Sequence, residues 1–422
     1  MDAPAQARLR VGVAWNLVPV FLLALVGLGL NFAIGRLWGP AALGSFNQVT
    51  TAYFVLGAFG AVSLNFSVLR AIAEAPEDKA RVSAIVVGGL VPSFVLGALV
   101  TVLFVSVRGG VARWLDSDAV ATGILWAAPG LFCFIVNKLL LGVVNGLSRM
   151  RAYALYTSLR YLLIALGLAV AWGLGLPAEA LPGIWSLSEG LLCLVLLAEV
   201  VTTVPVWRAP GWTSWARRHL SYGFRGFAAV LLFELNSRLD IWMLGPGFSD
   251  AMVGVYSMAA SMAEGASQLA VVLQVNVNPQ LAAHLAAGRH AEVQAIVGRT
   301  RRWFVPLMAA LSLLAVLLYP VIIPWLTGHS EFEAGATPFA LLMLGLTLSA
   351  PWLPFNQILL MGSRPGWHTV YVATGIATNV LGCFLLIPRY GLVGAALSGA
   401  ASLLISSLLL RCMVPALVKI KL

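Results

Sequence analysis

The chain has 422 residues, of which 60% are hydrophobic and 10% are charged, and its mean hydropathy is +0.92. This composition excludes an ordinary soluble protein and indicates that a lipid bilayer surrounds most of the chain. The formal net charge of +10 has to be explained in that setting.

Long apolar runs predict that the chain crosses the membrane as helices. Residues 17–34, 162–176 and 303–318 contain no charged side chain, and a membrane-spanning helix needs roughly 20 mostly apolar residues. No segment has the alternating pattern of an outer-membrane barrel, so helices remain as the structure that satisfies the backbone in lipid. Arg8 and Arg10 precede an apolar run too long for a signal peptide, and we expect this run to remain as the first span.

Charge clusters and breaks rich in Gly and Pro divide the sequence into about twelve helices. In chain order, the predicted helices cover residues 12–36, 42–73, 82–107, 119–146, 152–175, 183–206, 219–245, 251–285, 302–326, 335–361, 367–387 and 391–416. The expected fold class is therefore an all-α polytopic membrane protein.

The distribution of Lys and Arg orients these helices. Both residue types collect in short cytoplasmic loops, and most of the 26 lie inside when the N-terminus is cytoplasmic. The loops that are then outside contain Arg36, Arg108, Arg113 and Arg389. We expect a multi-pass protein of the bacterial inner membrane with both termini in the cytoplasm. The positive charge then faces anionic lipid, and no nucleic-acid partner is needed to explain it.

Two halves of the sequence carry similar turn signals in the same order and at nearly equal spacing. The matched positions are Gly44 with Gly254, Gly183 with Gly394, and the turn at 146–149 with the turn at 362–364. These matches predict two six-helix bundles, residues 1–210 and 211–422, as parallel repeats related by an axis along the membrane normal. A cleft between two such bundles suits a carrier that works by alternating access.

Segments with these turn signals resemble Wzx-type polysaccharide flippases. They are GRLWGPAALGSF at 35–46, LRAIAE at 69–74, DIWMLG at 240–245, VGVYS at 253–257, and Asn379 followed by LIPRYGLVGAA at 386–396. The resemblance covers nearly the whole chain and implies membership of the multidrug/oligosaccharidyl-lipid/polysaccharide exporter superfamily. In that superfamily, lipid II flippases usually have two more helices, and drug exporters share the twelve-helix plan.

The predicted seventh helix carries the largest group of ionisable residues in the membrane. An ionised side chain near the bilayer centre costs about 2.5 to 3.5 kcal/mol, so such residues persist mainly where they face a cavity or a partner. Glu234 and Arg238 are i,i+4 neighbours that can form an ion pair. Arg225 and Asp240 lie with Asn236 on the opposite face. Either face can line a cavity, and the alternative is a structural Glu234–Arg238 pair with Asp240 capping the helix end.

Three further candidates lie on other predicted helices. Arg160 shares a helix face with Tyr153 and Tyr156, and an arginine beside aromatic rings suits both phosphate and sugar. Lys138 lies about two turns from the cytoplasmic end of its helix, where snorkelling is the alternative. Glu264 is a candidate for ion or proton coupling, and the alternative is a satisfied hydrogen bond between helices.

Together with the resemblance, these residues lead to one main hypothesis. The protein moves polyprenyl-diphosphate-linked oligosaccharides from the cytoplasmic to the outer leaflet, for O-antigen, lipopolysaccharide or exopolysaccharide synthesis. The diphosphate binds to a cationic cavity of Arg160, Arg225, Arg238 and Lys138, and the coupling residues are Glu234, Asp240 and Glu264. Polysaccharide polymerase or assembly proteins are expected partners. Because the chain has neither a nucleotide-binding GxxxxGK[ST] motif nor paired cysteines, we expect no cofactor, metal site or catalytic residue.

Two alternatives stay open. A cation-coupled multidrug exporter of the same superfamily would need an acidic cavity, whereas the balance of bases and acids within the predicted spans is mildly basic. A membrane-embedded polysaccharide polymerase or ligase would need acid and base groups on a sizeable outer loop, where only His329, Glu331 and Glu333 cluster.

Overall fold

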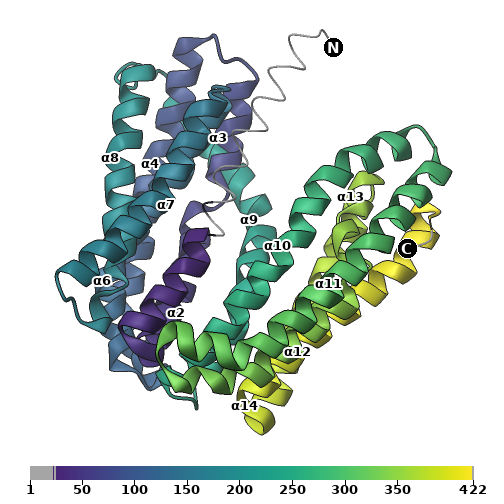
Figure 1. Cartoon of the computed structure of the whole chain (residues 1–422). Helices are drawn as coiled ribbons and strands as arrows, with labels where there is room; N and C mark the ends of the chain where they lie inside the picture. The colour runs from purple at the N-terminus through teal and green to yellow at the C-terminus, as the bar shows by residue number, and fades with distance from the viewer. Residues whose placement is uncertain (1–21, 23–24, 421–422) are drawn as a thin grey trace. The chain divides into compact units, whose positions relative to one another are not determined.

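The computed structural model describes residues 22 and 25–420, apart from the side chains of residues 226–233 and 235–238. Within these residues all regular structure is helical (Figure 1). Seven of the described helices are long and apolar enough to cross a membrane, and a bent pair forms an eighth candidate. The predicted fold class is confirmed, and the chain is a multi-pass membrane protein.

Packing divides the chain into two units. Unit 1 is Met1–Leu30 with Ser45–Arg238, and unit 2 is Asn31–Gly44 with Leu239–Leu422. Two of the three boundaries therefore fall inside α2 (Gly39–Ala61) and α9 (Trp212–Leu244), and the third falls inside the helix Leu25–Leu37. The proposed repeat boundary near residue 210 rests on the sequence match between the halves and stays a prediction.

Unit 1 is built around α6 (Asp118–Gly146), whose most extensive contacts are with α3 (Leu64–Ala73), α4 (Lys79–Ser106) and α8 (Gly183–Thr203). Small residues let the backbones approach closely, because a Cβ at Gly142 would lie 2.8 Å from the carbonyl oxygen of Asn65. Apolar side chains from these helices form one buried core. The unit also contains α5 (Arg108–Leu115), α7 (Met150–Gly173) and the 3-10 turn η1 (Ala178–Ala180).

Unit 2 contains the longest helices of the chain. Its elements are α10 (Asp250–Ala286), α11 (His290–Thr327), η2 (Ser330–Gly335), α12 (Ala336–Ser349), η3 (Leu353–Phe355), α13 (Ile358–Met361) and α14 (Pro365–Val418). Close packing of α12 on α14 depends on Gly345, where a Cβ would lie 2.6 Å from the Cα of Ala400. α14 includes two predicted helices, because Gly391 has φ 57° and ψ −131° and interrupts the helix there.

Two predicted helices are broken in the structure. The segment predicted at 42–73 bends by 45° between α2 and α3, where Val62 and Ser63 both have positive φ. The segment predicted at 335–361 is interrupted between α12 and α13 by Pro351 and Pro354, which lack the backbone donor that a helix requires. The first predicted helix is described as Leu25–Leu37, and the rest of it lies outside the described residues apart from residue 22.

The matched turns of the two halves have the same backbone geometry. Ser148 and Ser363 have φ of 58° and 57°. The next residue donates its N–H to the carbonyl five positions earlier in both turns, Arg149 to Val144 and Arg364 to Leu359. Helices α7 and α14 begin directly after these turns, so the Gly-Leu-Ser-Arg turn at 146–149 and the Gly-Ser-Arg turn at 362–364 each position the helix that follows.

Candidate functional site

The main polar cluster inside unit 1 is an ion pair between neighbouring helices. Arg160 on α7 places its Nε 2.8 Å from Oε1 of Glu189 on α8, and the two side chains are 15% and 2% exposed. Asn137 on α6 donates from Nδ2 to the Glu189 carboxylate at 2.8 Å and to the Glu189 carbonyl at 2.9 Å. The buried carboxylate thus has charged and neutral donors, which burial of a charge requires.

Aromatic side chains border this ion pair. The guanidinium carbon of Arg160 lies 5.5 Å from the ring centre of Phe134, and the Lys138 ammonium lies 4.8 Å from the same ring. The Tyr53 ring lies against Phe134 at an interplanar angle of 50°, and Tyr53 donates its hydroxyl to the carbonyl of Gly130 at 3.0 Å. Two of the predicted cationic residues therefore share one aromatic ring, which favours cations at its faces.

The charge of Arg160 is compensated within its own unit. Glu189 binds it directly, so an incoming phosphate would have to compete with a carboxylate already in place. Lys138 is half-buried and also lies in the electrostatic field of Glu234 and Glu189. This part of the predicted cavity is therefore a mixed-charge cluster instead of the purely cationic surface that we expected.

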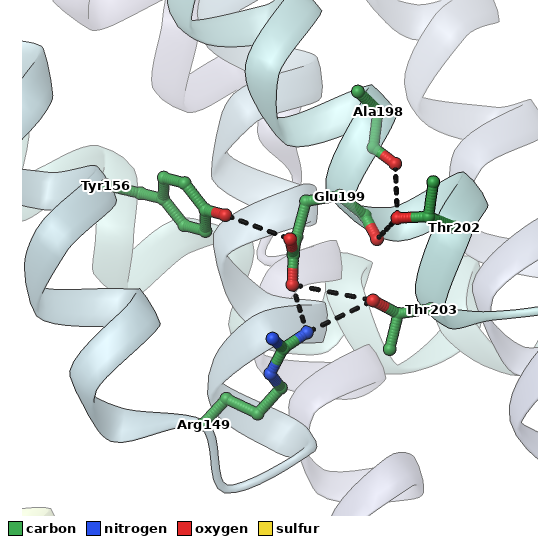
Figure 2. A network of polar contacts seen from close by, with 6 residues as sticks. All are labelled: Arg149, Tyr156, Ala198, Glu199, Thr202 and Thr203. Atoms are coloured by element: carbon green, nitrogen blue, oxygen red, sulfur yellow. Dashed lines mark hydrogen bonds and ion pairs between the residues drawn. The ribbon is translucent and has the colours of Figure 1, made fainter.

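The predicted aromatic face beside Arg160 has another role near the start of α7. Tyr156 donates its hydroxyl to Glu199 at 3.0 Å, and Tyr153 and Tyr156 pack against the apolar core of unit 1. Figure 2 shows that Glu199 also pairs with Arg149, which reaches Thr203 at 3.1 Å. This network connects the start of α7 to the end of α8.

The structure describes the side chains of some candidate residues on α9 but not of others. The Arg225 side chain is exposed and Glu234 is half-buried. The side chain of Arg238, and with it the predicted ion pair to Glu234, lies outside the described residues, as does that of Asn236. The roles of Arg225 and Arg238 in binding stay predictions.

Two predicted coupling residues lie in unit 2 and have different surroundings. Asp240 accepts a hydrogen bond from the hydroxyl of Tyr256 at 2.5 Å, and Tyr256 is fully buried. Tyr256 belongs to the VGVYS segment, so this segment positions a partner for Asp240. Glu264 is exposed on α10. Among the described residues, no three His, Cys, Asp or Glu side chains gather as a metal site would require.

Sequence reasoning missed the partnership between Arg160 and Glu189. Glu189 is visible as a carboxylate within an apolar run, and such a residue requires a partner. Helical spacing identifies partners on the same helix, whereas Arg160 lies 29 residues earlier on a different helix. Only the packing of α7 on α8 brings the two together.

Comparison with known proteins places the fold among membrane transporters. Residues 9–279 match a family described as polysaccharide biosynthesis protein, and no curated protein matches the chain in sequence. The structure is similar to lipid II flippase MurJ in an inward closed conformation, with a TM-score of 0.77 and 12% identity over 95% of this chain and 87% of that chain.

Two further solved structures have similar folds. One is the inward-facing conformation of a multidrug resistance MATE family transporter of the MOP superfamily, with a TM-score of 0.76 and 15% identity over 96% of this chain and 99% of that chain. The other is a MOP superfamily transporter from Pyrococcus furiosus described as having a binding pocket of reverse polarity, with a TM-score of 0.60 and 14% identity over 96% and 94% of the two chains. At these identities the likeness concerns the fold.

Proposed function

Because the chain belongs to the polysaccharide biosynthesis protein family, we propose that it moves polyprenyl-diphosphate-linked oligosaccharides from the cytoplasmic to the outer leaflet of the bacterial inner membrane. The supporting observation is that the family match over residues 9–279 occurs on a fold similar to that of the lipid II flippase MurJ. The resemblance to this superfamily in the sequence is thereby confirmed. The sugar repeat belongs to an O-antigen, a lipopolysaccharide or an exopolysaccharide, and polymerase or assembly proteins receive it.

The proposed binding groups are the cations at membrane depth. Arg225 and Arg238 bind the diphosphate, because guanidinium groups donate two parallel hydrogen bonds to phosphate oxygens. Lys138 adds a positive charge beside Phe134, and the Arg160–Glu189 pair holds the neighbouring helices in register. The sugar moves through a water-filled cavity of the protein while the lipid tail stays in the bilayer.

The energy for transport comes from an ion gradient or from the membrane potential, which supplies about 2.3 kcal/mol per charge per 100 mV. Glu234, Asp240 and Glu264 are the proposed coupling groups. Asp240 is the best supported of them structurally, because protonation would change its hydrogen bond with the buried Tyr256 hydroxyl.

A second candidate function is a cation-coupled multidrug exporter. It is favoured by the similarity to a MATE transporter, whose TM-score of 0.76 almost equals that of the flippase. The buried carboxylate of Glu189 and the half-buried Asp240 are acidic groups that such a carrier could use. An enzymatic polymerase or ligase is a third hypothesis, and glycosyl transfer by the purified protein would favour it.

A deletion strain distinguishes these functions. Loss of the gene is expected to cause accumulation of lipid-linked oligosaccharide on the cytoplasmic leaflet, with unchanged sensitivity to cationic drugs. The chain expressed from a plasmid should reverse this accumulation. Increased drug sensitivity with normal levels and sidedness of the lipid-linked sugar would contradict the flippase proposal and favour the exporter.

A further inference from the structure

A second cationic cluster lies in unit 2, apart from the residues discussed above. It consists of Arg301 on α11, Trp352 before η3 and Arg411 on α14. The guanidinium carbons of Arg301 and Arg411 lie 5.6 and 5.9 Å from the ring centre of Trp352. Two positive groups from different helices thus meet at one indole ring.

The break between α12 and α13 positions this arginine–tryptophan cluster. Pro351 and Pro354 interrupt the helix, which leaves the carbonyl of Pro351 available to accept a hydrogen bond from Arg301 Nε at 2.7 Å. Trp352 packs against the apolar core formed by α10, α11, α13 and α14, and Phe355 in that core is fully buried. The geometry of the cluster is therefore fixed by backbone and core contacts.

Several donors of the cluster have no acceptor. Arg301 Nη2 and Trp352 Nε1 are both buried without a hydrogen-bond partner. Within the described part of the chain, neither Arg301 nor Arg411 forms an ion pair with a carboxylate, and Arg411 is exposed. Unpaired buried donors and like charges near one another are unfavourable. An anion bound between Arg301 and Arg411 would accept hydrogen bonds from the unpaired donors and would neutralise the two positive charges.

We propose that Arg301, Trp352 and Arg411 form a binding site for a phosphate group. Guanidinium groups bind phosphate oxygens through charge-assisted hydrogen bonds, and the indole N–H adds a neutral donor. The predicted topology places the cluster in the cytoplasmic half of the membrane, where anionic lipid headgroups are abundant. The phosphate belongs to a phospholipid headgroup or is free inorganic phosphate. This site does not depend on the function proposed above.

Lipid binding by the full-length purified protein tests the site. The protein in neutral detergent is titrated with short-chain phosphatidylglycerol, and bound lipid is counted by native mass spectrometry, with diacylglycerol as the lipid without phosphate. Arg411→Gln removes an exposed charge, and Trp352→Phe keeps a ring but removes the N–H. Arg299→Gln is the control, because Arg299 is exposed on α11, the helix that carries Arg301, and its substitution removes the same charge as Arg411→Gln.

We expect the wild type and Arg299→Gln to retain phosphatidylglycerol, and Arg411→Gln and Trp352→Phe to bind it about tenfold more weakly, as loss of one hydrogen bond to a charged group implies. Displacement by inorganic phosphate would identify free phosphate as a sufficient ligand, and its failure would identify the lipid headgroup. Equal binding by Arg411→Gln, Trp352→Phe and Arg299→Gln, or equal retention of diacylglycerol, would overturn the proposal. Unfolding temperatures confirm that each variant is folded.

Discussion

The ion pair between Arg160 and Glu189 is largely buried, and each charge depends on the other. Removing one partner of a buried pair costs about 3 to 5 kcal/mol, because it leaves an uncompensated charge. We expect Glu189→Gln to lower the unfolding temperature of the purified protein clearly. The double variant Arg160→Met, Glu189→Gln should recover much of this loss, since no buried charge remains unpaired. Equal unfolding temperatures for the wild type and the single variant would contradict the pairing.

The ion pair of Arg149 with Glu199 offers a comparison in a more exposed setting. Its side chains are 43% and 19% exposed, and exposed pairs contribute about 0 to 1 kcal/mol. Glu199→Gln should therefore reduce stability much less than Glu189→Gln in the same unfolding measurement. The small difference should shrink further at high salt, because salt screens exposed charges. A loss as large as that of Glu189→Gln would show that Tyr156 and Thr203 make this network strongly cooperative.

For single residues, the sequence predicts which charged side chains need partners but does not identify those partners. Arg160, Lys138 and Asp240 were identified because charge in a membrane is costly. Phe134 lies four residues before Lys138 on α6 itself, whereas Glu189 and Tyr256, the partners of Arg160 and Asp240, lie on other helices. The periodicity of a single helix carries no information about such contacts.

At the scale of the elements, turn signals predicted helix boundaries well where glycine or serine adopts a positive φ. Gly391 and the turns at Ser148 and Ser363 are in this group. The bend at Val62 carries no such signal, because a β-branched residue rarely adopts positive φ and does so here within the packed unit. The sequence also stays apolar across the break between α12 and α13, so hydropathy alone does not predict that break.

The matched glycines of the two halves meet each other in unit 2. A Cβ on Gly44 would overlap the carbonyl of Asp250, and a Cβ on Gly254 would overlap the carbonyl of Pro40. We expect Gly44→Ala and Gly254→Ala to force the start of α2 away from α10 and to lower the unfolding temperature. Gly265→Ala is the control on α10, because nothing lies within 4 Å of its added Cβ.

The Gly265→Ala variant should be as stable as the wild type or slightly more stable, since alanine favours a helix by about 1 kcal/mol over glycine. Similar unfolding temperatures for Gly254→Ala and Gly265→Ala would show that the contact between α2 and α10 does not require glycine.

At the scale of the whole molecule, charge distribution predicts where the loops lie. Glu333 is placed outside and Lys419 inside, and both side chains are exposed. In a cysteine-free background, Glu333→Cys should react with a membrane-impermeant thiol reagent in intact spheroplasts. Lys419→Cys should react only after the membrane is permeabilised. The reverse pattern would show an inverted topology. The side of the membrane on which the substrate is proposed to bind first would then have to change as well.

The fold of the whole molecule could be predicted from sequence because twelve apolar segments and their charges leave few arrangements. The site could be predicted only as a set of candidates. Arg225 and Arg238 were selected by their depth in α9, and their contact with a substrate depends on which face of α9 meets water. Spacing along the sequence does not determine this.

Transport in reconstituted vesicles tests the central proposal most directly. Vesicles containing the wild type are expected to move a fluorescent lipid-linked oligosaccharide between leaflets, and Arg225→Ala and Arg238→Ala should slow this movement about tenfold or more, as loss of a charged phosphate contact implies. Arg299→Ala is the control for loss of an exposed positive charge. If the wild type moves no lipid-linked oligosaccharide, or if Arg225→Ala and Arg238→Ala move it as fast as Arg299→Ala, the cationic binding site for a lipid-linked diphosphate is contradicted.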